Sequence, residues 1–310
     1  MAVVMFAIQC LLWGTTWMCI KIGLNDFPPL LFAGARFLAA ALIMFLILVW
    51  KKERIIWEWK ALSPSVVFGI LNAFSFAFVF WGEQFLSSSL TAIINATVPF
   101  FSAIFAHFLV GERLNWFKVS ALTVGFSGIF LIFGTNLGSS AFSEIWGELA
   151  IIGAAACYAM AGVHLKRNHT AMNPIPAVTV QMGVTAVPLL LVGLPLEAGS
   201  RITISWPGVA SFLFLVLLGS VAAFLIYYYL VQKMEISKVS YVSMFTPVVA
   251  AVNGVVWLHE PMKWQLVAGF GLVAAGMIVL NSFGDFRRSR VAGGMEVKGG
   301  GRTGFFGGGR

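Results

Sequence analysis

Charged residues are scarce in this sequence. Only 10% of its 310 residues are Asp, Glu, Lys or Arg, whereas a soluble domain carries about 25%. Hydrophobic residues make up 59% of the chain, and the mean hydropathy is +0.91. This composition excludes a soluble globular protein and predicts a polytopic membrane protein. The first apolar run begins almost at Met1 with no cleavage-site pattern after it, so we expect a retained span rather than a signal peptide.

Cysteine, histidine and acidic residues are also few. Cys10, Cys19 and Cys157 lie inside apolar segments without metal or redox spacing, so we expect small buried side chains and no metal or cofactor. The 12 acidic residues and four histidines are scattered singly, whereas an enzyme acting on lipids needs such groups clustered at one membrane face. The sequence has no Gly-x-x-x-x-Gly-Lys-Ser/Thr phosphate loop, which argues against ATP hydrolysis by this chain.

The basic residues lie in short loops between apolar runs and form no cluster on a soluble domain. The net charge of +8 therefore does not indicate nucleic-acid binding. Because Lys and Arg are retained on the cytoplasmic side of a membrane, their distribution predicts that both termini are cytoplasmic. The residues assigned to the cytoplasmic loops and tail are Lys51, Lys52, Arg54, Lys60, Arg113, Lys118, Lys166, Arg167, Lys233, Lys238, Arg287, Arg288 and Arg290.

Ten apolar runs are long enough to cross a bilayer, which takes about 20 helical residues. They cover approximately residues 3–23, 30–50, 65–86, 89–110, 116–135, 146–165, 175–195, 207–230, 238–258 and 264–283. The joins are short, and no soluble domain fits between the runs. The sequence therefore predicts an all-α integral membrane protein with ten transmembrane helices.

The fourth and ninth runs share a pattern, because Pro99 and Glu112 recur as Pro247 and Glu260 at a common offset of 148. Other pairs at this offset are Gln84 and Gln232, Ser89 and Ser237, Trp116 and Trp264, and Gly128 and Gly276. At a nearby offset of 145, the pairs are Trp13 and Tyr158, Lys21 and Lys166, and Pro29 and Pro174. These matches indicate an internal duplication.

Five spans per half is an odd number, so the second half must lie upside down relative to the first. We expect residues 1–140 to form the first five-helix repeat and residues 141–284 the second, inverted repeat. Residues 285–310 are dominated by glycine and are expected to form a disordered cytoplasmic tail.

The paired prolines predict two breaks in membrane helices. A proline inside a helix cannot donate its backbone hydrogen bond and clashes with the carbonyl four residues back, here that of Asn95 or Ser243. In lipid, such breaks survive only where they face protein or a wet cavity. Matching breaks in two halves are typical of a transporter's binding site, so Pro99 and Pro247 are predicted hinge residues.

Several short motifs occur in order along both halves. They are Leu12-Trp13-Gly14, Pro28-Pro29, Ala33-Gly34-Ala35-Arg36-Phe37, Glu83-Gln84, Ala96-Thr97-Val98-Pro99, Gly111-Glu112-Arg113-Leu114, Gly125 to Gly128, Pro247 and Glu260-Pro261. With them, residues 5–283 resemble the EamA family of the drug/metabolite transporter superfamily. The resemblance implies ten helices in two inverted five-helix repeats, and export or exchange of small metabolites such as amino acids.

The resemblance also implies that helices one to four and six to nine surround a central cavity, with helices five and ten at the periphery. One departure from the family pattern is His259, which stands where the family usually has glycine before the glutamate.

Aromatic residues mark one face of the first span. Trp13 and Trp17 are four residues apart and so share a helix face, and Tyr158 is the counterpart of Trp13 in the second half. Trp13 lies about 15 Å along its helix, near the midplane. These rings either line a substrate cavity or belong to an interfacial belt or plain helix packing.

Two ionisable residues lie within or near apolar runs. Glu83 is a candidate for proton coupling or for binding a substrate ammonium group, although the adjacent Ser87 loop offers it contact with water. Arg36 could bind a substrate carboxylate, but snorkelling of its guanidinium to the outer headgroups is the favoured interpretation.

Amides and tyrosines complete the candidate substrate-binding residues. Asn72, Asn95 and Gln181 must each bond a neighbouring helix or a solute. Interhelical bonding is the more expected role except for Asn95, which lies at the proline break. Helical residues are 100° apart, so the consecutive tyrosines 227–229 cannot all face one cavity, and we select Tyr228 as the counterpart of Phe80.

Two further features concern helix packing. Glu112 and Glu260 end their helices at the negative end of the dipole, which is unfavourable unless the carboxylate is paired, so we expect each to clamp neighbouring helices. Glycines in the fifth and tenth spans, among them Gly125, Gly128 and Gly276, permit close helix approach. Packing within the bundle and a homodimer seam both fit them.

Together these patterns predict a secondary transporter of the cell (inner) membrane and not an enzyme. It would export small metabolites, such as amino acids or other amphipathic solutes, by alternating access. Its partners would be the small-molecule substrate and the lipid bilayer, with a proton or solute gradient as the energy source. The alternative is a membrane-embedded enzyme acting on a lipid or lipid-linked group.

Overall fold

The computed structural model describes residues 2–111, 116–136, 142–168, 173–233, 239, 242–261, 264, 266–276 and 278–279. Every regular element in these ranges is a helix. Seven helical segments of the described chain are long and apolar enough to cross a membrane, and three further apolar helices are shorter. The prediction of an all-α membrane protein is confirmed.

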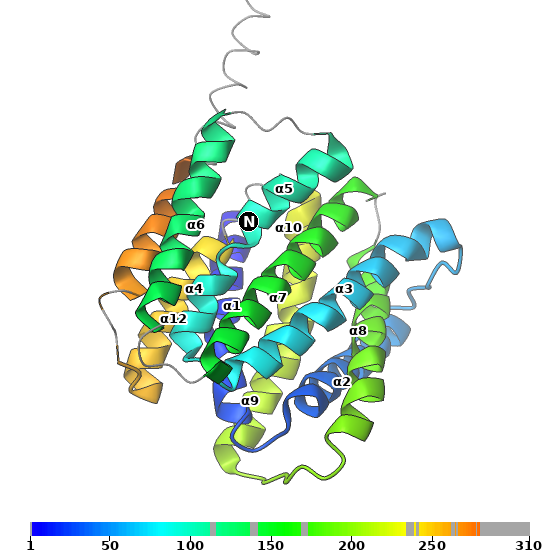
Figure 1. The fold of residues 1–310 in the computed structure, drawn as a ribbon. Helices are drawn as coiled ribbons and strands as arrows, with labels where there is room; N and C mark the ends of the chain where they lie inside the picture. The colour runs from blue at the N-terminus through cyan, green and yellow to red at the C-terminus, as the bar shows by residue number, and fades with distance from the viewer. Residues whose placement is uncertain are drawn as a thin grey trace, which may run out of the picture.

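The predicted spans correspond to the observed helices in order (Figure 1). The first five spans correspond to α1 (Ala2–Gly23), α2 (Pro29–Trp50), α3 (Trp59–Glu83), the pair α4 (Ser88–Asn95) and α5 (Val98–Val110), and α6 (Trp116–Asn136). The last five correspond to α7 (Phe142–Arg167), α8 (Pro174–Leu196), the series α9 (Trp206–Val216), η1 (Leu217–Ala222) and α10 (Ala223–Lys233), α12 (Val242–Leu258), and a helix over Leu266–Gly276.

Turn chemistry sets where several helices begin. Pro29 and Pro174 are the first residues of α2 and α8, the position where a missing N–H costs nothing. Asn173 caps α8 by accepting a hydrogen bond from the Ile175 N–H, and Ser87 caps α4 by accepting one from the Leu90 N–H. At the predicted joins, Ser87 and Asn173 therefore begin the next helix through side-chain caps.

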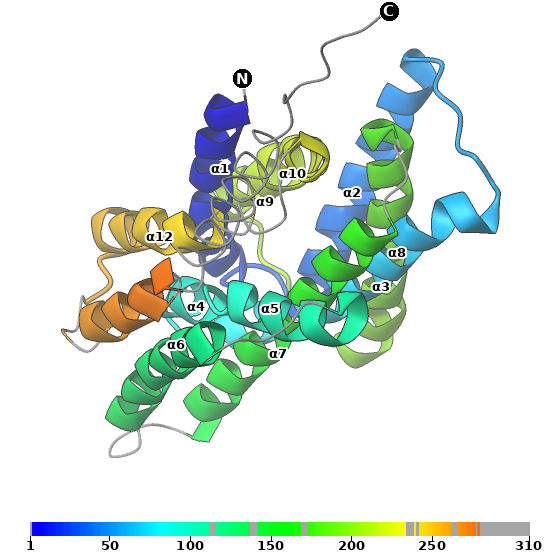
Figure 2. The same ribbon diagram turned by 90° about the horizontal axis from the view of Figure 1, so that it is seen from above.

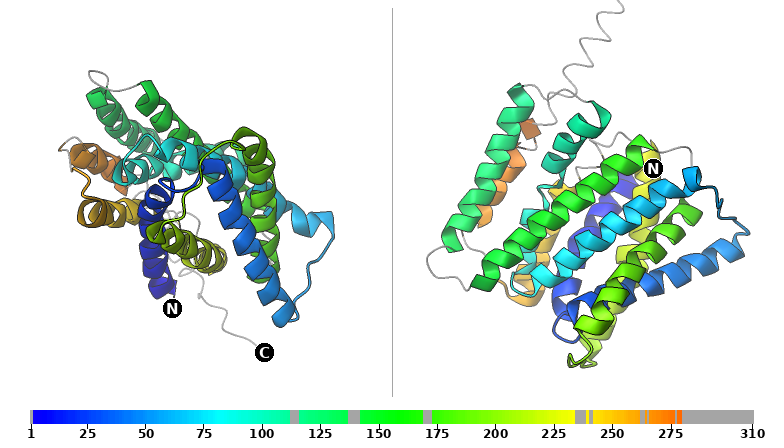
Figure 3. Two further views of the ribbon diagram at one scale, coloured as in Figure 1. Left: turned by 90° about the horizontal axis from the view of Figure 1, so that it is seen from below. Right: turned by 45° about the vertical axis from the view of Figure 1, so that its right-hand side comes forward.

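The helices pack as interlocking pairs. α2 packs against α8, α3 against α7 and α8, α1 against α12, and α5 against α7. Seen from above, α6, α12 and the helix over residues 266–276 lie at one end of the bundle, and α2, α3 and α8 lie at the other (Figure 2). Figure 3 shows α7, α3 and α8 side by side in its right-hand view. Large apolar side chains such as Leu46, Phe108 and Leu191 are exposed around the bundle, as expected of a surface that faces lipid.

The two prolines occupy different backbone settings. The fourth span is interrupted at residues 96–97, and Pro99 is the second residue of α5. Pro247, in contrast, lies inside the uninterrupted helix α12. The break predicted from the sequence is thus present in the first half, while the second half carries its proline within one helix.

A second irregularity, which the sequence analysis did not anticipate, lies in the eighth span. Residues Leu217–Ala222 form a π-helix between α9 and α10. π-turns insert an extra residue into a helix and often occur at functional sites. The segment contains Gly219 and Ser220, both buried.

Glycines bring α6 and the helix over residues 266–276 into backbone contact. A Cβ atom on Gly128 would lie 2.6 Å from the Gly269 carbonyl oxygen, and one on Gly276 would lie 2.7 Å from the Ala121 carbonyl oxygen. Either approach is too close for a side chain, so these glycines serve packing within one chain. The homodimer stays a prediction. Glu112, Arg113 and the tail over residues 285–310 lie outside the described residues.

Candidate functional site

Two neighbouring cavities lie in the interior of the bundle and share the side chains of Trp13, Val98, Tyr158 and Ser243. The larger, of about 80 Å³, is named here the Arg36 cavity. The smaller, of about 40 Å³, is named the Tyr227 cavity. Since one water needs roughly 10–15 Å³ of such space, each cavity can hold water, and the larger can hold a small solute group.

The lining of the Arg36 cavity comes from both halves of the chain. It consists of Trp13, Thr16, Trp17, Ile20, Arg36, Ser75, Phe76, Val79, Asn95, Val98, Tyr158, Phe224, Ser243 and Thr246. Most of this wall is aromatic or aliphatic, with a few hydroxyls, one amide and one guanidinium. A mainly apolar wall with few polar groups is typical of a small-molecule site.

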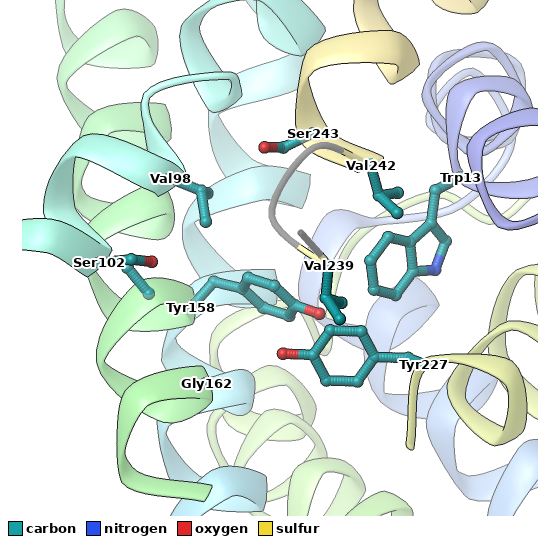
Figure 4. A pocket seen from close by; sticks show the side chains of 10 residues that line it. Trp13, Val98, Ser102, Tyr158, Gly162, Tyr227, Val239, Val242 and Ser243 are labelled. Carbon is teal, nitrogen blue, oxygen red and sulfur yellow. The ribbon is translucent and has the colours of Figure 1, made fainter. Parts of the chain in front are cut away.

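Three aromatic rings line part of the Tyr227 cavity, with valine and serine side chains around the rest (Figure 4). The ring of Trp13 lies 5.5 Å from that of Tyr227 and 5.9 Å from that of Tyr158. The hydroxyls of Tyr158 and Tyr227 point toward one another across the cavity. The rings of Trp13 and Tyr158, from α1 and α7, line both cavities, whereas that of Tyr227, from α10, lines only the smaller one.

Four of the predicted substrate-binding residues come together at these cavities. Trp13 and Tyr158 line both of them, and Trp17 and Asn95 line the Arg36 cavity. Trp17 is buried, which places it inside the bundle and away from an interfacial belt. Asn95 ends α4 at the break before Pro99.

Tyr228 is placed differently from the prediction. The structure puts Tyr227 in the wall of the smaller cavity and packs the ring of Tyr228 against Phe68, with 6.1 Å between ring centroids. Tyr228 was selected as the counterpart of Phe80, and Phe80 itself lies outside the lining of both cavities. Which tyrosine faces the cavity depends on the rotation of α10, which directly follows the π-helix.

Asn72 and Gln181 are buried between α3 and α8, outside the lining of both cavities. The Asn72 amide donates a hydrogen bond to the Thr185 hydroxyl at 3.3 Å. The Gln181 amide is fully buried and has no hydrogen-bond partner among the described residues. Asn72 thus makes the interhelical bond that was the more expected role, and Gln181 lies between the same helices without a partner among the described residues.

Glu83 does not reach water. Its side chain is fully buried, and neither carboxylate oxygen has a hydrogen-bond partner in the described part of the chain. The nearby Lys21 ammonium bonds backbone oxygens instead, at 2.8 Å from the Glu83 carbonyl and 2.6 Å from the Leu86 carbonyl. A cation at the carboxyl end of α3 satisfies orphan carbonyls, so Lys21 caps this helix end beside the buried carboxyl.

The favoured interpretation of Arg36 is also wrong. The guanidinium does not snorkel to the headgroups, because the residue is only 1% exposed. Its Nε donates to the Ser220 hydroxyl at 2.8 Å and its Nη2 to the Gly219 carbonyl at 3.1 Å. The π-helix turns these acceptors toward α2, so the inward orientation depends on a tertiary contact with the second half.

Three carboxylates join helices of the two halves at the same end of the bundle as Lys21. Asp26, after α1, accepts hydrogen bonds from the Thr203 hydroxyl at 2.9 Å, the Ser205 N–H at 3.2 Å and the Ser205 hydroxyl. These donors hold the pKa of Asp26 below its ordinary value, with the Ser205 hydroxyl as the main cause. The contact connects the α1–α2 turn to the start of α9.

Glu197 and Glu260 make the other two contacts. Glu197 accepts hydrogen bonds from the backbone N–H groups of Leu30 and Leu31 at 2.9 and 2.8 Å. Glu260 accepts from the Ser88 N–H at 2.6 Å and also bonds Ser89 at the start of α4. A carboxylate at a helix amino terminus is stabilised by the dipole and the free N–H groups.

The predicted clamp is therefore confirmed for Glu260. The other acidic residues that close this end, Asp26 and Glu197, were not selected from the sequence. The only sequence signal for them was the cap residue Ser205 before an apolar run. Within the described residues, no group of three or more His, Cys, Asp or Glu side chains could hold a metal ion.

Comparison with known proteins agrees with this architecture. The model of the EamA-like transporter family matches residues 1–134 and 145–282. A solved crystal structure matches with a TM-score of 0.65 and 18% identity, covering 91% of this chain and 96% of that chain. This similarity extends over nearly the whole fold.

Curated relatives also match over most of their length. A protein of Bacillus subtilis named as the uncharacterized transporter YoaV is 30% identical over 91% of this chain and 96% of its own. A protein of Salmonella typhimurium named as a probable amino-acid metabolite efflux pump is 27% identical over 90% and 94%. The inner membrane transporter YedA of Escherichia coli is 27% identical over 79% and 78%.

Proposed function

This chain belongs to the EamA-like transporter family, and from that membership we propose that it is a secondary transporter exporting small amphipathic metabolites, amino acids among them. The names of the Salmonella and Escherichia coli relatives favour efflux across the inner membrane. The observation that carries the proposal is the pair of cavities at the centre of the bundle. Their walls are contributed by both halves of the chain.

Alternating access requires two halves that can rock against one another, and we propose that residues 1–140 and 141–284 are inverted five-helix repeats. Equivalent lysines support this arrangement. Lys21 donates to the Leu86 carbonyl at 2.6 Å, and Lys166 donates to the Val231 carbonyl at 2.9 Å. Lys166 lies 145 positions after Lys21, and Val231 lies 145 positions after Leu86. This is the same offset that relates Tyr158 to Trp13.

Helix packing adds independent support. The close approach of Gly128 to the Gly269 carbonyl is repeated by that of Gly276 to the Ala121 carbonyl. Gly276 is the counterpart of Gly128 in the other half, and Ala121 is the counterpart of Gly269, so the same contact occurs twice. The residues that end α5 and α12 agree as well. Gly111 and His259, which are counterparts at the same offset as Pro99 and Pro247, both have left-handed backbone angles, with φ of 76° and 53°.

The described conformation fits the inward-facing state of such a cycle. With the termini in the cytoplasm, the end that contains Asp26, Glu197 and Glu260 is the outer face. Each carboxylate joins one half to the other there, which keeps that face closed. Opening it would break these contacts while the cytoplasmic end closes, with the interruption before Pro99 and the helix around Pro247 as hinges.

Proton coupling through Glu83 is the proposed energy source. The carboxyl is buried close enough to Lys21, Arg36 and Glu260 to feel their charges, and intramembrane carboxylates commonly serve proton relays. Glu260 is one of the charges that act on Glu83. A proton gained or lost at Glu83 therefore changes the electrostatic energy of the Glu260 contacts that hold the outer face closed.

Reconstitution in liposomes tests the function. Preloaded vesicles are expected to exchange labelled amino acids by counterflow without chemical change, in the absence of ATP. Vesicles without protein provide the background. Conversion of a lipid or lipid-linked compound with no solute flux would instead establish the membrane-enzyme alternative.

A further inference from the structure

Arg36 is a buried cation in the wall of the larger cavity. Two of its nitrogens have acceptors, since Nε bonds the Ser220 hydroxyl and Nη2 bonds the Gly219 carbonyl. The remaining nitrogen, Nη1, is buried and has no hydrogen-bond partner among the described residues. The guanidinium is thus held in place on one side, while both N–H groups of Nη1 are left unused.

The surroundings of this guanidinium are aromatic. Its central carbon lies 5.1 Å from the ring centroid of Phe37, 5.0 Å from that of Phe76 and 5.9 Å from that of Phe80. Aromatic rings attract a cation, but they accept no strong hydrogen bond. They hold the planar group in position and leave the free donor for another acceptor.

No acidic residue neutralises Arg36 by direct contact in the described part of the chain. The cavity lining contains no Asp or Glu. Glu83, the acid whose charge acts on Arg36, has both oxygens without a hydrogen-bond partner. A buried charge with an unused donor is strongly unfavourable without an anion or further hydrogen bonds.

We propose that Arg36 is the anion-binding residue of this site and that the transported solute carries a carboxylate, bound at Nη1. The inference rests on the proposed transport function and specifies its substrate class. The apolar part of the solute would lie against Trp13, Trp17 and Phe224, which line the same cavity. Since the lining offers a cation and no carboxylate, monoanions are preferred over cations of the same shape.

The π-helix explains how this residue is positioned. A Cβ atom on Gly219 would lie 2.8 Å from Thr16 Cγ2 and 3.3 Å from Arg36 Nη2, so glycine lets α1 pack closely here and leaves room beside the guanidinium. The counterpart of Arg36 in the second half is Gln181, a neutral amide between α3 and α8. The proposed repeats therefore differ in charge here, and the pathway contains one anion subsite rather than two.

Three probes of matched shape test the proposal on the purified full-length protein. Benzoate, benzamide and benzylamine differ in charge while keeping the same ring. Ligand binding to the folded state raises the melting midpoint, and titrating each probe against this shift gives its affinity. Benzoate is expected to bind tighter than benzamide by about tenfold or more, because hydrogen bonds to charged groups are the stronger ones. Benzylamine is expected to cause no shift.

The variant Arg36→Met keeps an unbranched side chain and removes the charge. It is expected to weaken benzoate binding to the level of benzamide. Arg201→Met is the matched control, because it removes the same charge from an exposed position in the α8–α9 loop, and it is expected to keep the preference for benzoate. Arg36→Lys retains a cation and is expected to retain the preference at reduced affinity.

Several results would overturn the anion subsite. Equal or stronger binding of benzylamine to the wild-type protein would do so even if Arg36→Met failed to fold. Chloride stabilising the protein as strongly as benzoate would mean that the site takes any small anion. Counterflow that responds to amines and acids alike would remove the subsite but keep transport, whereas benzoate binding without any solute flux would remove transport and keep the subsite.

Discussion

Glu260 accepts two hydrogen bonds from Ser89, one from its backbone N–H at 3.1 Å and one from its hydroxyl at 2.6 Å. The bonds connect the end of α12 to the start of α4, which lie in different halves of the chain. In the proposed cycle this contact must break whenever the outer face opens. Weakening this pair of residues should therefore change the equilibrium between the inward-facing and outward-open states.

The substitution Glu260→Gln is expected to favour the outward-open state, because an amide accepts weaker hydrogen bonds than a carboxylate at a helix amino terminus. Cys19 is a natural reporter, being buried in α1 with 5% exposure. With Cys10 and Cys157 replaced by alanine, a membrane-impermeant maleimide added outside should label Cys19 faster in the variant. Glu58→Gln, at an exposed site between α2 and α3, is the charge-matched control, and an equal labelling rate in all three proteins would contradict the prediction.

Asp26 should make part of the stability depend on pH. Its hydrogen bonds with Ser205 and Thr203 lower the pKa in the folded protein, relative to about 4 when unfolded. The carboxylate therefore stabilises the fold above the unfolded pKa, and this contribution is lost as pH falls through the folded value. The melting midpoint of wild type should exceed that of Asp26→Asn most at neutral pH, and the gap should narrow in acid. A gap that widens on acidification would have the wrong sign.

The residues that end α5 and α12 give a pair of opposite predictions. His259 has φ of 53° and Gly111 has φ of 76°, a region that costs an L-residue about 1–2 kcal/mol. His259→Gly should stabilise the protein by up to about 1 kcal/mol, since glycine's greater freedom when unfolded offsets part of the gain. Gly111→Ala should destabilise it by about 1 kcal/mol. Melting midpoints that move in the same direction for both variants would argue against backbone strain as the cause.

Pro99→Ala should reduce transport more than membrane insertion. Alanine restores a backbone N–H that can bond the Asn95 carbonyl, so α4 and α5 can join into one helix and the hinge is stiffened. Counterflow per inserted molecule is the measurement, with insertion followed by the amount of protein in the membrane fraction. Pro188→Ala, inside α8, is a control for a membrane proline outside the proposed hinges. Unchanged flux in Pro99→Ala would remove Pro99 from the mechanism.

Glu83→Gln should remove the pH dependence of flux while leaving exchange at a fixed pH measurable. The amide keeps the shape of the buried side chain and cannot carry a proton. Initial counterflow rates between about pH 5.5 and 8, a range chosen to avoid acid unfolding, would be compared with wild type. A pH profile identical to that of wild type would exclude Glu83 as the coupling group.

The sequence by itself determined the membrane class and the order of the helices, because lipid requires about 20 apolar residues for each span. It also indicated the break before Pro99, since proline cannot complete the helical bonding there. The uninterrupted helix around Pro247 shows that a proline alone does not determine a break. Trp13 and Tyr158 were identified because their matching positions in the two halves and central depth can be counted along the chain. Local chemistry and simple periodicity are sufficient for such features.

Only the tertiary structure decided the direction of Arg36, the choice between Tyr227 and Tyr228, and the closure at Asp26, Glu197 and Glu260. Each depends on a partner in the other half of the chain or on the rotation of a helix after an irregular turn. A buried arginine and a snorkelling one have the same position in the sequence. The π-helix supplies the two acceptors that hold the guanidinium inside, and their placement next to α2 follows from the packing of two distant helices.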